Sequence, residues 1–310
     1  MTSESATADM ETSPYSHSLN SPIKAIPVRH PFRVLIALFM LAGVLALFND
    51  AAHRELYDWD TYREYILSAR VFAASLVTLE LTLYAMVISV MLGILLAVMR
   101  QSPNPIFTSV SWLFIWFFRG TPVYVQLVFW GLLSTIYPSV TFGLPHLGEF
   151  FTIADTNLIS LFTLAVIGLS LNESAYMAEI VRAGLLSVDK GQEEAAKALG
   201  MSWGLTMRRI IIPQAMRIII PPTGNEVISM LKTTSLVTAI PLTIDLYMTT
   251  RDIAALTYRP IPLLLVASTW YLFYTSILMV GQYFLEKRFA RGHNQVTGDA
   301  VVVPDSFGGG

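Results

Sequence analysis

The stretch GQEEAAKALGMSWGLTMRRIIIP, residues 191–213, decides the fold because it is polar and helical in pattern between apolar segments of membrane length. The chain of 310 residues is 54% hydrophobic and only 14% charged, whereas soluble domains carry about 25% charged residues. This composition predicts an all-α polytopic membrane protein. The chain has no cysteine, which excludes disulfides and thiolate metal sites. We expect no metal site, no cofactor and no nucleic-acid partner in this chain.

The polar stretch carries helix start and stop signals of its own. Asp189 begins a capping-box pattern, and Gly200 suits the left-handed conformation that ends a helix. Ser202 can cap a second short helix, and Pro213 lies where that helix should stop or bend. The sequence therefore predicts two short helices over about 189–212 that meet at an angle and project from the membrane.

Six membrane crossings are the simplest interpretation of the apolar runs. The third crossing is interrupted by FRGTP, residues 118–122, so that we expect residues 106–118 to lie near the interface. We interpret the first run as a retained helix in preference to a cleaved signal segment. Residues 1–31 and 292–310 are predicted to be disordered tails, and 49–70 an external loop. The predicted crossings cover about 32–48, 71–99, part of 106–137, 157–181, 216–240 and 263–285.

Basic residues set the predicted orientation, because Lys and Arg near membrane spans favour the cytoplasmic side. With the N-terminus inside, fourteen of the 20 Lys and Arg residues fall on the cytoplasmic side and five outside, and Lys232 falls within a span. We therefore expect both termini and the 189–212 element to be cytoplasmic, in a multi-pass protein of the cell (inner) membrane. Arg119 is interpreted as an anchor at the cytoplasmic interface.

Several ionisable residues fall inside predicted spans, where a charge costs about 2.5–3.5 kcal/mol on insertion scales and needs a partner or water. Glu179 and Arg182 are three residues apart and are predicted to form a structural ion pair. Glu173 points about 180° away from Arg182, toward a solute path or another helix. The candidate path residues are Glu80, Glu173, Asn225, Glu226, Lys232 and Thr233. Interhelical hydrogen bonds that hold the bundle are an equal alternative for each.

These candidates differ in their surroundings. Asn225 and Glu226 follow the proline pair Pro221–Pro222, which is predicted to break the helix and free backbone carbonyls. Glu80 lies off the polar stripe of its own helix, so that the stripe and Glu80 face different neighbours. A solute that carries both an ammonium and a carboxylate would need groups of both signs along the path. A glutamate could bind the first, and Lys232 with nearby hydroxyls the second.

The sequence lacks several motifs that would place chemistry in this chain. It contains no P-loop pattern that could bind ATP, and no zinc-protease or nucleophile-elbow motif. We therefore expect no enzyme activity in the chain itself. An energised pump would need ATP-Mg on a second chain. A secondary transporter would need none, but usually carries two similar halves, and no convincing repeat occurs here.

The stretch at 191–213 resembles the signature loop of permease subunits of binding-protein-dependent ABC importers, which reads E-A-A, three residues, Gly, nine residues, I-x-L-P. The matching residues are Glu194, Ala195, Ala196, Gly200, Ile210 and Pro213, with Ile212 in place of Leu. Further segments, including FFRGTPVYVQLVFW at 117–130, resemble the polar amino-acid (His/Glu/Gln/Arg/opine-type) branch of that family. The resemblance covers roughly residues 68–292.

The resemblance implies a fold, a function and partners. It implies a five-helix type I permease core over 71–291, preceded by an extra N-terminal transmembrane helix at 32–48. It implies that the 189–212 loop forms coupling helices that seat on separate ATP-binding cassette ATPase subunits. A second permease subunit, identical or homologous, and an extracytoplasmic amino-acid-binding protein complete the importer. The alternatives are a permease of the same architecture for another small solute, such as an opine or sulfur amino acid, or an autonomous secondary transporter.

Overall fold

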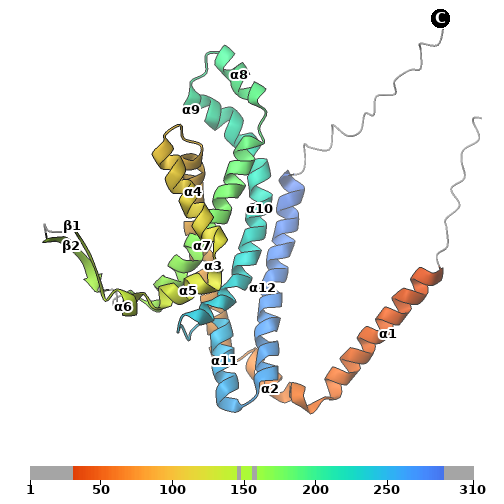
Figure 1. The fold of residues 1–310 in the computed structure, drawn as a ribbon. Coiled ribbons are helices and arrows are strands. Elements are labelled where there is room, and N and C mark those ends of the chain that lie inside the picture. Colours follow the sequence, from red (N-terminus) through yellow and green to blue (C-terminus); the bar gives the residue numbers. More distant parts are fainter. Residues whose placement is uncertain (1–30, 145–147, 156–158, 290–310) are drawn as a thin grey trace, which may run out of the picture. The chain divides into compact units, whose positions relative to one another are not determined.

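The computed structural model describes residues 31–144, 148–155 and 159–289 (Figure 1), so that the predicted tails lie almost wholly outside the described residues. The chain divides into two units, residues 1–54 and 55–310. In the first unit, helix α1 (Pro31–His53) is long and apolar enough to span a membrane, since its segment Phe32–His53 has a mean hydropathy of 2.2. An ion pair between Arg54 Nε and Asp50, at 2.6 Å, lies at its end.

The second unit is helical, in agreement with the predicted all-α class. One antiparallel hairpin, β1 (Ser139–Leu144) with β2 (Gly148–Asp155), was not predicted. The helices before the hairpin are the short 3₁₀ segment η1 (Glu55–Tyr57), α2 (Trp59–Ile66), α3 (Ala69–Arg100), α4 (Pro105–Gly120), α5 (Val123–Gly131) and α6 (Leu133–Ile136). Those after it are α7 (Leu161–Leu186), α8 (Lys190–Ala198), α9 (Trp203–Thr206), the π-helical turn η3 (Met207–Ile211), α10 (Ile212–Thr233), the 3₁₀ segment η4 (Thr234–Ala239), α11 (Leu246–Thr257) and α12 (Pro260–Phe289).

In this unit, α3, α7 and α12 are each long and apolar enough to span a membrane, as is α1 in the first unit. The interrupted third crossing is the pair α4 and α5, which bends by 99° at the FRGTP segment. The fifth predicted crossing consists of α10 followed directly by η4 instead of one apolar helix. Polar residues along α10, described below, explain why this crossing is less apolar than the others.

The centre of the bundle is a contact between α3 and α7, which pack side by side (Figure 1). Gly93 of α3 allows the approach, because a Cβ added there would lie 2.5 Å from Met177 Cβ and 3.1 Å from the backbone N of Ala178. Buried side chains on both sides of this crossing, including Leu81 and Leu169, form the main core cluster. This contact fixes the position of α7, and with it Glu173.

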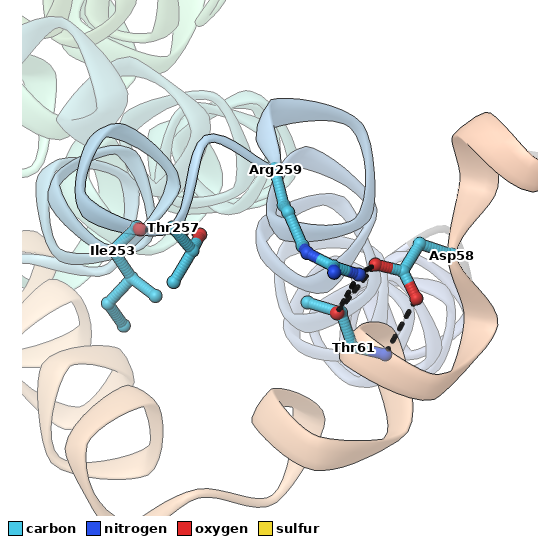
Figure 2. A network of polar contacts seen from close by, with 5 residues as sticks. All are labelled: Asp58, Thr61, Ile253, Thr257 and Arg259. Carbon is cyan, nitrogen blue, oxygen red and sulfur yellow. Dashed lines mark hydrogen bonds and ion pairs between the residues drawn. The ribbon is translucent and has the colours of Figure 1, made fainter.

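Helix α2 is fastened to the turn between α11 and α12 by a polar network (Figure 2). Asp58 caps α2 by accepting hydrogen bonds from the backbone N and hydroxyl of Thr61, at 3.3 and 2.7 Å. Arg259 forms an ion pair with Asp58 and donates to Thr61 Oγ1 at 3.1 Å. Trp270 of α12 adds a bond from its indole N–H to the carbonyl of Ile66, at 2.9 Å. The amphipathic α2 is therefore part of the bundle end that lies opposite α8 and α9 (Figure 1).

Candidate functional site

The helical pair α8 and α9 stands at one end of the bundle, as Figure 1 shows. Asp189 caps α8 by accepting a hydrogen bond from the backbone N of Gly191 at 2.6 Å. Gly200 has a φ of +73°. Its N–H donates a hydrogen bond to the carbonyl of Lys197 at 2.9 Å, and the N–H of Met201 donates to the carbonyl of Ala196 at 3.0 Å. These two bonds form a Schellman motif, which requires the left-handed residue at this position. Glycine therefore ends α8 and turns the chain into α9.

The expectation that Pro213 stops or bends the second helix is wrong. The chain continues from α9 through the π-helical turn, which contains Ile210, into α10, and Pro213 lies in the first turn of α10. Proline is tolerated there because the first N–H groups of a helix have no partner within the helix. As a result, a nearly continuous helical path joins the protruding pair to the bundle.

Leu199 and Trp203 are the two most exposed large apolar side chains on this pair, and the sequence analysis did not single them out. Leu199 is 81% exposed and Trp203 72% exposed, on either side of Gly200. Glu194 and Ala195 are also exposed, whereas Ala196 is buried. Large apolar residues within an otherwise polar segment are the sequence feature that could have predicted this exposed apolar surface. A projecting surface with this composition is suited to docking another protein.

The structure brings together two of the predicted path residues, Glu173 of α7 and Glu226 of α10. Glu226 is the charged group that acts most strongly on the Glu173 carboxyl, and the two helices that carry these residues pack against each other. Glu173 is 7% exposed, and its Oε1 has no hydrogen-bond partner within the described residues. An acidic pair with an unsatisfied oxygen is suited to binding a cation, because buried polar atoms otherwise find partners.

A recess of about 420 Å³ adjoins this acidic pair between α4, α7 and α10. Glu226 and Arg119 both line it, and the guanidinium of Arg119 lies 5.2 Å from the centre of the Tyr176 ring. Tyr176 was not predicted, although it is three residues from Glu173 and so shares its helix face. The recess thus offers a carboxylate, a guanidinium and an aromatic face within one space.

Glu179 lies at the edge of the same recess. Arg182 donates to its Oε2 from Nη2 at 2.6 Å and from Nε at 3.0 Å, so that the expected pair on one helix face is present. A neighbouring recess of about 440 Å³ shares Arg119, Tyr176 and Glu179 and continues to Arg100 at the end of α3. The two recesses therefore lead from the acidic pair toward the end of the bundle that bears α8 and α9.

The remaining predicted path residues lie elsewhere. Asn225 and Lys232 line a third recess, of about 350 Å³, formed with α12, while the Thr233 hydroxyl donates to the carbonyl of Ser229 at 3.0 Å. At about 100° per residue, these residues and Glu226 all fall within an arc of roughly 120° on α10. Glu80 is not part of this arc. It is exposed on α3.

The proline pair does not break α10, contrary to the sequence-based expectation. The helix runs from Ile212 to Thr233 with Pro221 and Pro222 inside it. Gln282 of α12 donates to the carbonyl of Pro221 at 2.8 Å, and a side chain at Gly224 would collide with Gln282. The helix persists because a neighbouring helix satisfies backbone groups of α10.

An amide network holds the bend between α4 and α5, and the sequence analysis missed it. Gln126 Nε2 donates to the carbonyls of Phe118 and Thr121, each at 3.1 Å. Asn172 of α7 donates from Nδ2 to the Phe118 carbonyl at 2.9 Å and to Gln126 Oε1 at 3.2 Å. The bend leaves these carbonyls without helical partners, and the two amides supply the missing donors. The presence of two amide side chains within apolar helices is the sequence feature that could have predicted this network.

A helical membrane bundle with a protruding helical pair and a charged interior recess is the architecture of a solute permease. The comparison with family models agrees: residues 89–291 match the family described as "Binding-protein-dependent transport system inner membrane component". The chain belongs to this family, and is a multi-pass membrane permease.

Individual relatives of the chain are permease proteins of amino-acid and opine transport systems. The chain is 56% identical over 301 residues to the arginine transport system permease protein ArgU of Corynebacterium glutamicum, covering 92% of this chain and 94% of that protein. It is 38% identical to the histidine/lysine/arginine/ornithine transport system permease protein HisM of Escherichia coli K12, covering 67% and 84%. It is 34% identical to the nopaline transport system permease protein NocM of Agrobacterium fabrum, covering 67% and 83%.

Among solved structures, the fold is similar to a chain of an amino acid ABC transporter crystallised with histidines. The TM-score is 0.59 at 34% sequence identity, over 70% of this chain and 93% of the other. A chain of the MetNI methionine ABC transporter gives a TM-score of 0.52 at 15% identity, over 73% and 96%, which supports the fold alone.

Proposed function

We propose that this chain is the permease subunit of an ABC importer for basic amino acids, with arginine as the leading substrate. The observation that carries the proposal is the acidic pair Glu173–Glu226 beside a recess that also holds Arg119. The relatives named for arginine, for histidine, lysine, arginine and ornithine, and for nopaline support the same class of solute.

The chemistry of the recess fits such a solute. Arginine carries two cations, the α-ammonium and the guanidinium, and one carboxylate. The acidic pair supplies two carboxyl groups for cations, and the Arg119 guanidinium can bind a carboxylate through two parallel hydrogen bonds. The exposed face of Tyr176 adds a surface for a planar guanidinium. A neutral amino acid would leave part of the acidic pair without a charged partner, which disfavours it.

The remaining parts of the importer follow from the family and the protruding pair. We infer that α8 and α9 seat on separate ATPase subunits, which bind and hydrolyse ATP-Mg, so that the chain itself is not an enzyme. An extracytoplasmic binding protein delivers the solute at the opposite end, and a second permease subunit completes the path. The excess of basic residues at the α8–α9 end supports cytoplasmic termini in the cell membrane.

Uptake into proteoliposomes that contain the chain, its ATPase and its binding protein tests the substrate class. Glu226→Gln removes one charged acceptor, and a hydrogen bond to a charged group contributes about 1.5–3 kcal/mol. We expect arginine uptake to fall by about tenfold or more, since about 1.4 kcal/mol corresponds to a factor of ten. Glu64→Gln on exposed α2 serves as the matched control and should leave uptake unchanged.

Three results would count against this proposal. Equal loss of uptake for Glu64→Gln and Glu226→Gln would remove the special role of the acidic pair. Uptake by the chain alone, without an ATPase, would identify an autonomous secondary transporter. If the wild-type complex imports an opine or a sulfur amino acid in preference to arginine, the substrate assignment is wrong although the architecture stands.

The docking role of α8 is tested separately by co-purification. Glu194→Lys reverses a charge on the exposed surface of α8 and should lower the amount of ATPase that co-purifies, with membrane insertion intact. Glu64→Lys makes the same reversal at the opposite end of the bundle and should have no effect. Equal co-purification of both variants with the ATPase would refute docking through α8.

A further inference from the structure

Two adjoining cavities run from the membrane-spanning part of α3, α7 and α10 to the base of α8. The first, the apolar groove, has a volume of about 430 Å³ and is formed by these three helices with Leu285 of α12. Among the described residues that line it, only Thr223 carries a polar side chain. The second, the polar recess, has a volume of about 630 Å³. Val98, Leu185 and Met207 line both, so that one space leads into the other.

The apolar groove has the length of about one membrane leaflet. It is lined on α3 from Val90 to Val98 and on α7 from Met177 to Leu185, eight residues or about 12 Å in each case. Val98 and Leu185 lie within two residues of the ends of their helices. The groove therefore begins at the membrane surface that bears α8 and extends inward through about half of a hydrocarbon core about 30 Å thick.

The lining of α10 agrees with this length. A Cβ added at Gly184, near the end of α7, would lie 3.3 Å from the carbonyl oxygen of Ala215, so that Ala215 marks the same level on α10. From there the lining ends at Val227, twelve residues or about 18 Å further on. A spanning helix of another protein would cross both leaflets, whereas a single acyl chain reaches only to the middle of the membrane. The groove fits the acyl chain.

The polar recess offers a cation at the end of this groove. Glu193 lines it but pairs with Lys197 at 2.7 Å, and Asp189 caps α8. Lys190 also lines it and forms no ion pair within residues 159–289 or the other described parts of the chain. The amide and hydroxyl of two further residues and one indole complete its polar and aromatic lining, from Gln101, Ser102 and Trp203. An indole of this kind is suited to the level of lipid headgroups.

We propose that the two cavities together bind one phospholipid, with an acyl chain in the apolar groove and the phosphate on the Lys190 ammonium. A phospholipid has its parts in this order, since an apolar chain one leaflet long joins a charged head at the membrane surface. Basic recesses between helices at a membrane surface bind such headgroups. The lipid then contacts α8 and α10 at once and becomes part of the joint between the helical pair and the bundle.

The proposed lipid does not occupy the solute recess. Pro222 and Glu226 of α10 line the recess beside the acidic pair. Thr223 and Val227, each one position later, line the apolar groove and are turned by about 100° around the same helix. The two sites thus lie on different faces of α10. The inference goes beyond the proposed function, because it assigns a second ligand of a different chemical class.

The natural absence of cysteine allows one photoreactive group to report what fills the groove. Ile94→Cys places a thiol in the groove, and Leu95→Cys places the matched control beside it on α3, outside the groove. The two native side chains are 47% and 54% exposed, so that both thiols are accessible. Each variant is labelled with a small diazirine maleimide, purified as the whole importer in detergent and illuminated, and the mass of the intact chain is measured.

We expect Ile94→Cys to carry an adduct with the mass of one phospholipid, and Leu95→Cys to carry far less, because detergent removes lipid that only surrounds the protein. Equal phospholipid adducts at the two positions overturn the proposal. An adduct of Ile94→Cys to another polypeptide also overturns it, since a protein segment then fills the groove.

Lys190→Gln tests the phosphate contact in the Ile94→Cys background. Importer stripped of lipid is supplied with dipalmitoyl phosphatidylglycerol at a half-saturating amount. We expect Lys190→Gln to lower the adduct by about three- to fivefold, as for other exposed charge pairs. Lys287→Gln, a basic residue of α12 outside the recess, should leave it unchanged. Equal adducts for the two variants, or full occupancy of the groove by palmitate alone, overturn the assignment of a phospholipid.

The lipid site and the proposed function fail independently. Neither adduct measurement uses a solute or ATP, so that a phospholipid adduct in an importer that does not take up basic amino acids refutes the substrate assignment alone. Arginine import that depends on Glu226 in an importer without the adduct refutes only the lipid site.

Discussion

Replacing Gly93 by alanine tests whether the α3–α7 crossing positions the candidate site. The added Cβ would lie 2.5 Å from Met177 Cβ and 3.1 Å from the backbone N of Ala178. Ordinary van der Waals contact begins at 3.4 Å, so that the helices must separate by about 0.9 Å at this point. Neither a Cβ atom nor a backbone nitrogen can rotate away, and overpacking of this kind costs about 1–3 kcal/mol.

The matched control is Gly281→Ala on α12, where nothing lies within 4 Å of the added Cβ. Both variants exchange the same residues inside a long helix, where alanine is favoured over glycine by about 1 kcal/mol. The difference between them therefore isolates the collision. At about 2–4 °C per kcal/mol for a domain of this size, we expect Gly93→Ala to melt several degrees below Gly281→Ala in detergent or nanodiscs.

A transport measurement completes this test. Met177 lies one turn beyond Glu173 on α7, so that displacement of α7 moves Glu173 relative to Glu226. We expect arginine uptake by the reconstituted complex to fall for Gly93→Ala and to stay near wild type for Gly281→Ala. If the two variants have equal melting temperatures and equal uptake, the close α3–α7 crossing does not exist as described.

Three further changes test separate parts of the structure. Arg259→Gln removes the half-exposed ion pair of Figure 2 and should cost about 1 kcal/mol, while amide exchange in α2 becomes faster. Unchanged exchange would show that α2 is held by other contacts. Gln126→Leu leaves the half-buried carbonyl of Phe118 with fewer donors and should lower thermal stability by about 1–3 kcal/mol. A melting temperature equal to wild type would argue against the amide network. Gly200→Ala places a side chain on a residue with φ +73°, at a cost of about 1–2 kcal/mol, and should reduce ATPase co-purification. Gly204→Ala is the control and should not reduce it, because no atom lies within 4 Å of the added Cβ.

The sequence predicts the helical pair well because its signals are local. A capping aspartate, an alanine-rich segment and a glycine at the left-handed position act within a few residues, and the Schellman bonds at Gly200 follow from them. The expectation for Pro213 fails because the same residue that stops one helix can begin the next. Which of the two occurs depends on the preceding residues, here a π-helical turn that keeps the chain helical.

The candidate site is less predictable because it depends on how distant helices meet. The sequence indicates that Glu173 and Glu226 need partners, but not that they become each other's neighbours across the α7–α10 contact. The behaviour of the proline pair also depends on a distant residue. The donor to the Pro221 carbonyl is Gln282, sixty-one residues away in the sequence. The hairpin was missed because residues 139–155 adjoin an apolar run and carry no tight-turn dipeptide between strands.

The geometry of α10 connects the two ends of the proposed mechanism. The helical path from Trp203 to Glu226 contains twenty-four residues and is about 35 Å long, and no loop interrupts it. A displacement of α8 and α9 by an ATPase would therefore reach Glu226 through one element, while Glu173 stays with α7 against α3. Since the two carboxyl groups come from these two elements, relative motion of α10 and α7 changes the spacing of the acidic pair. ATP-driven movement and affinity for a cationic solute would then be coupled at a single contact.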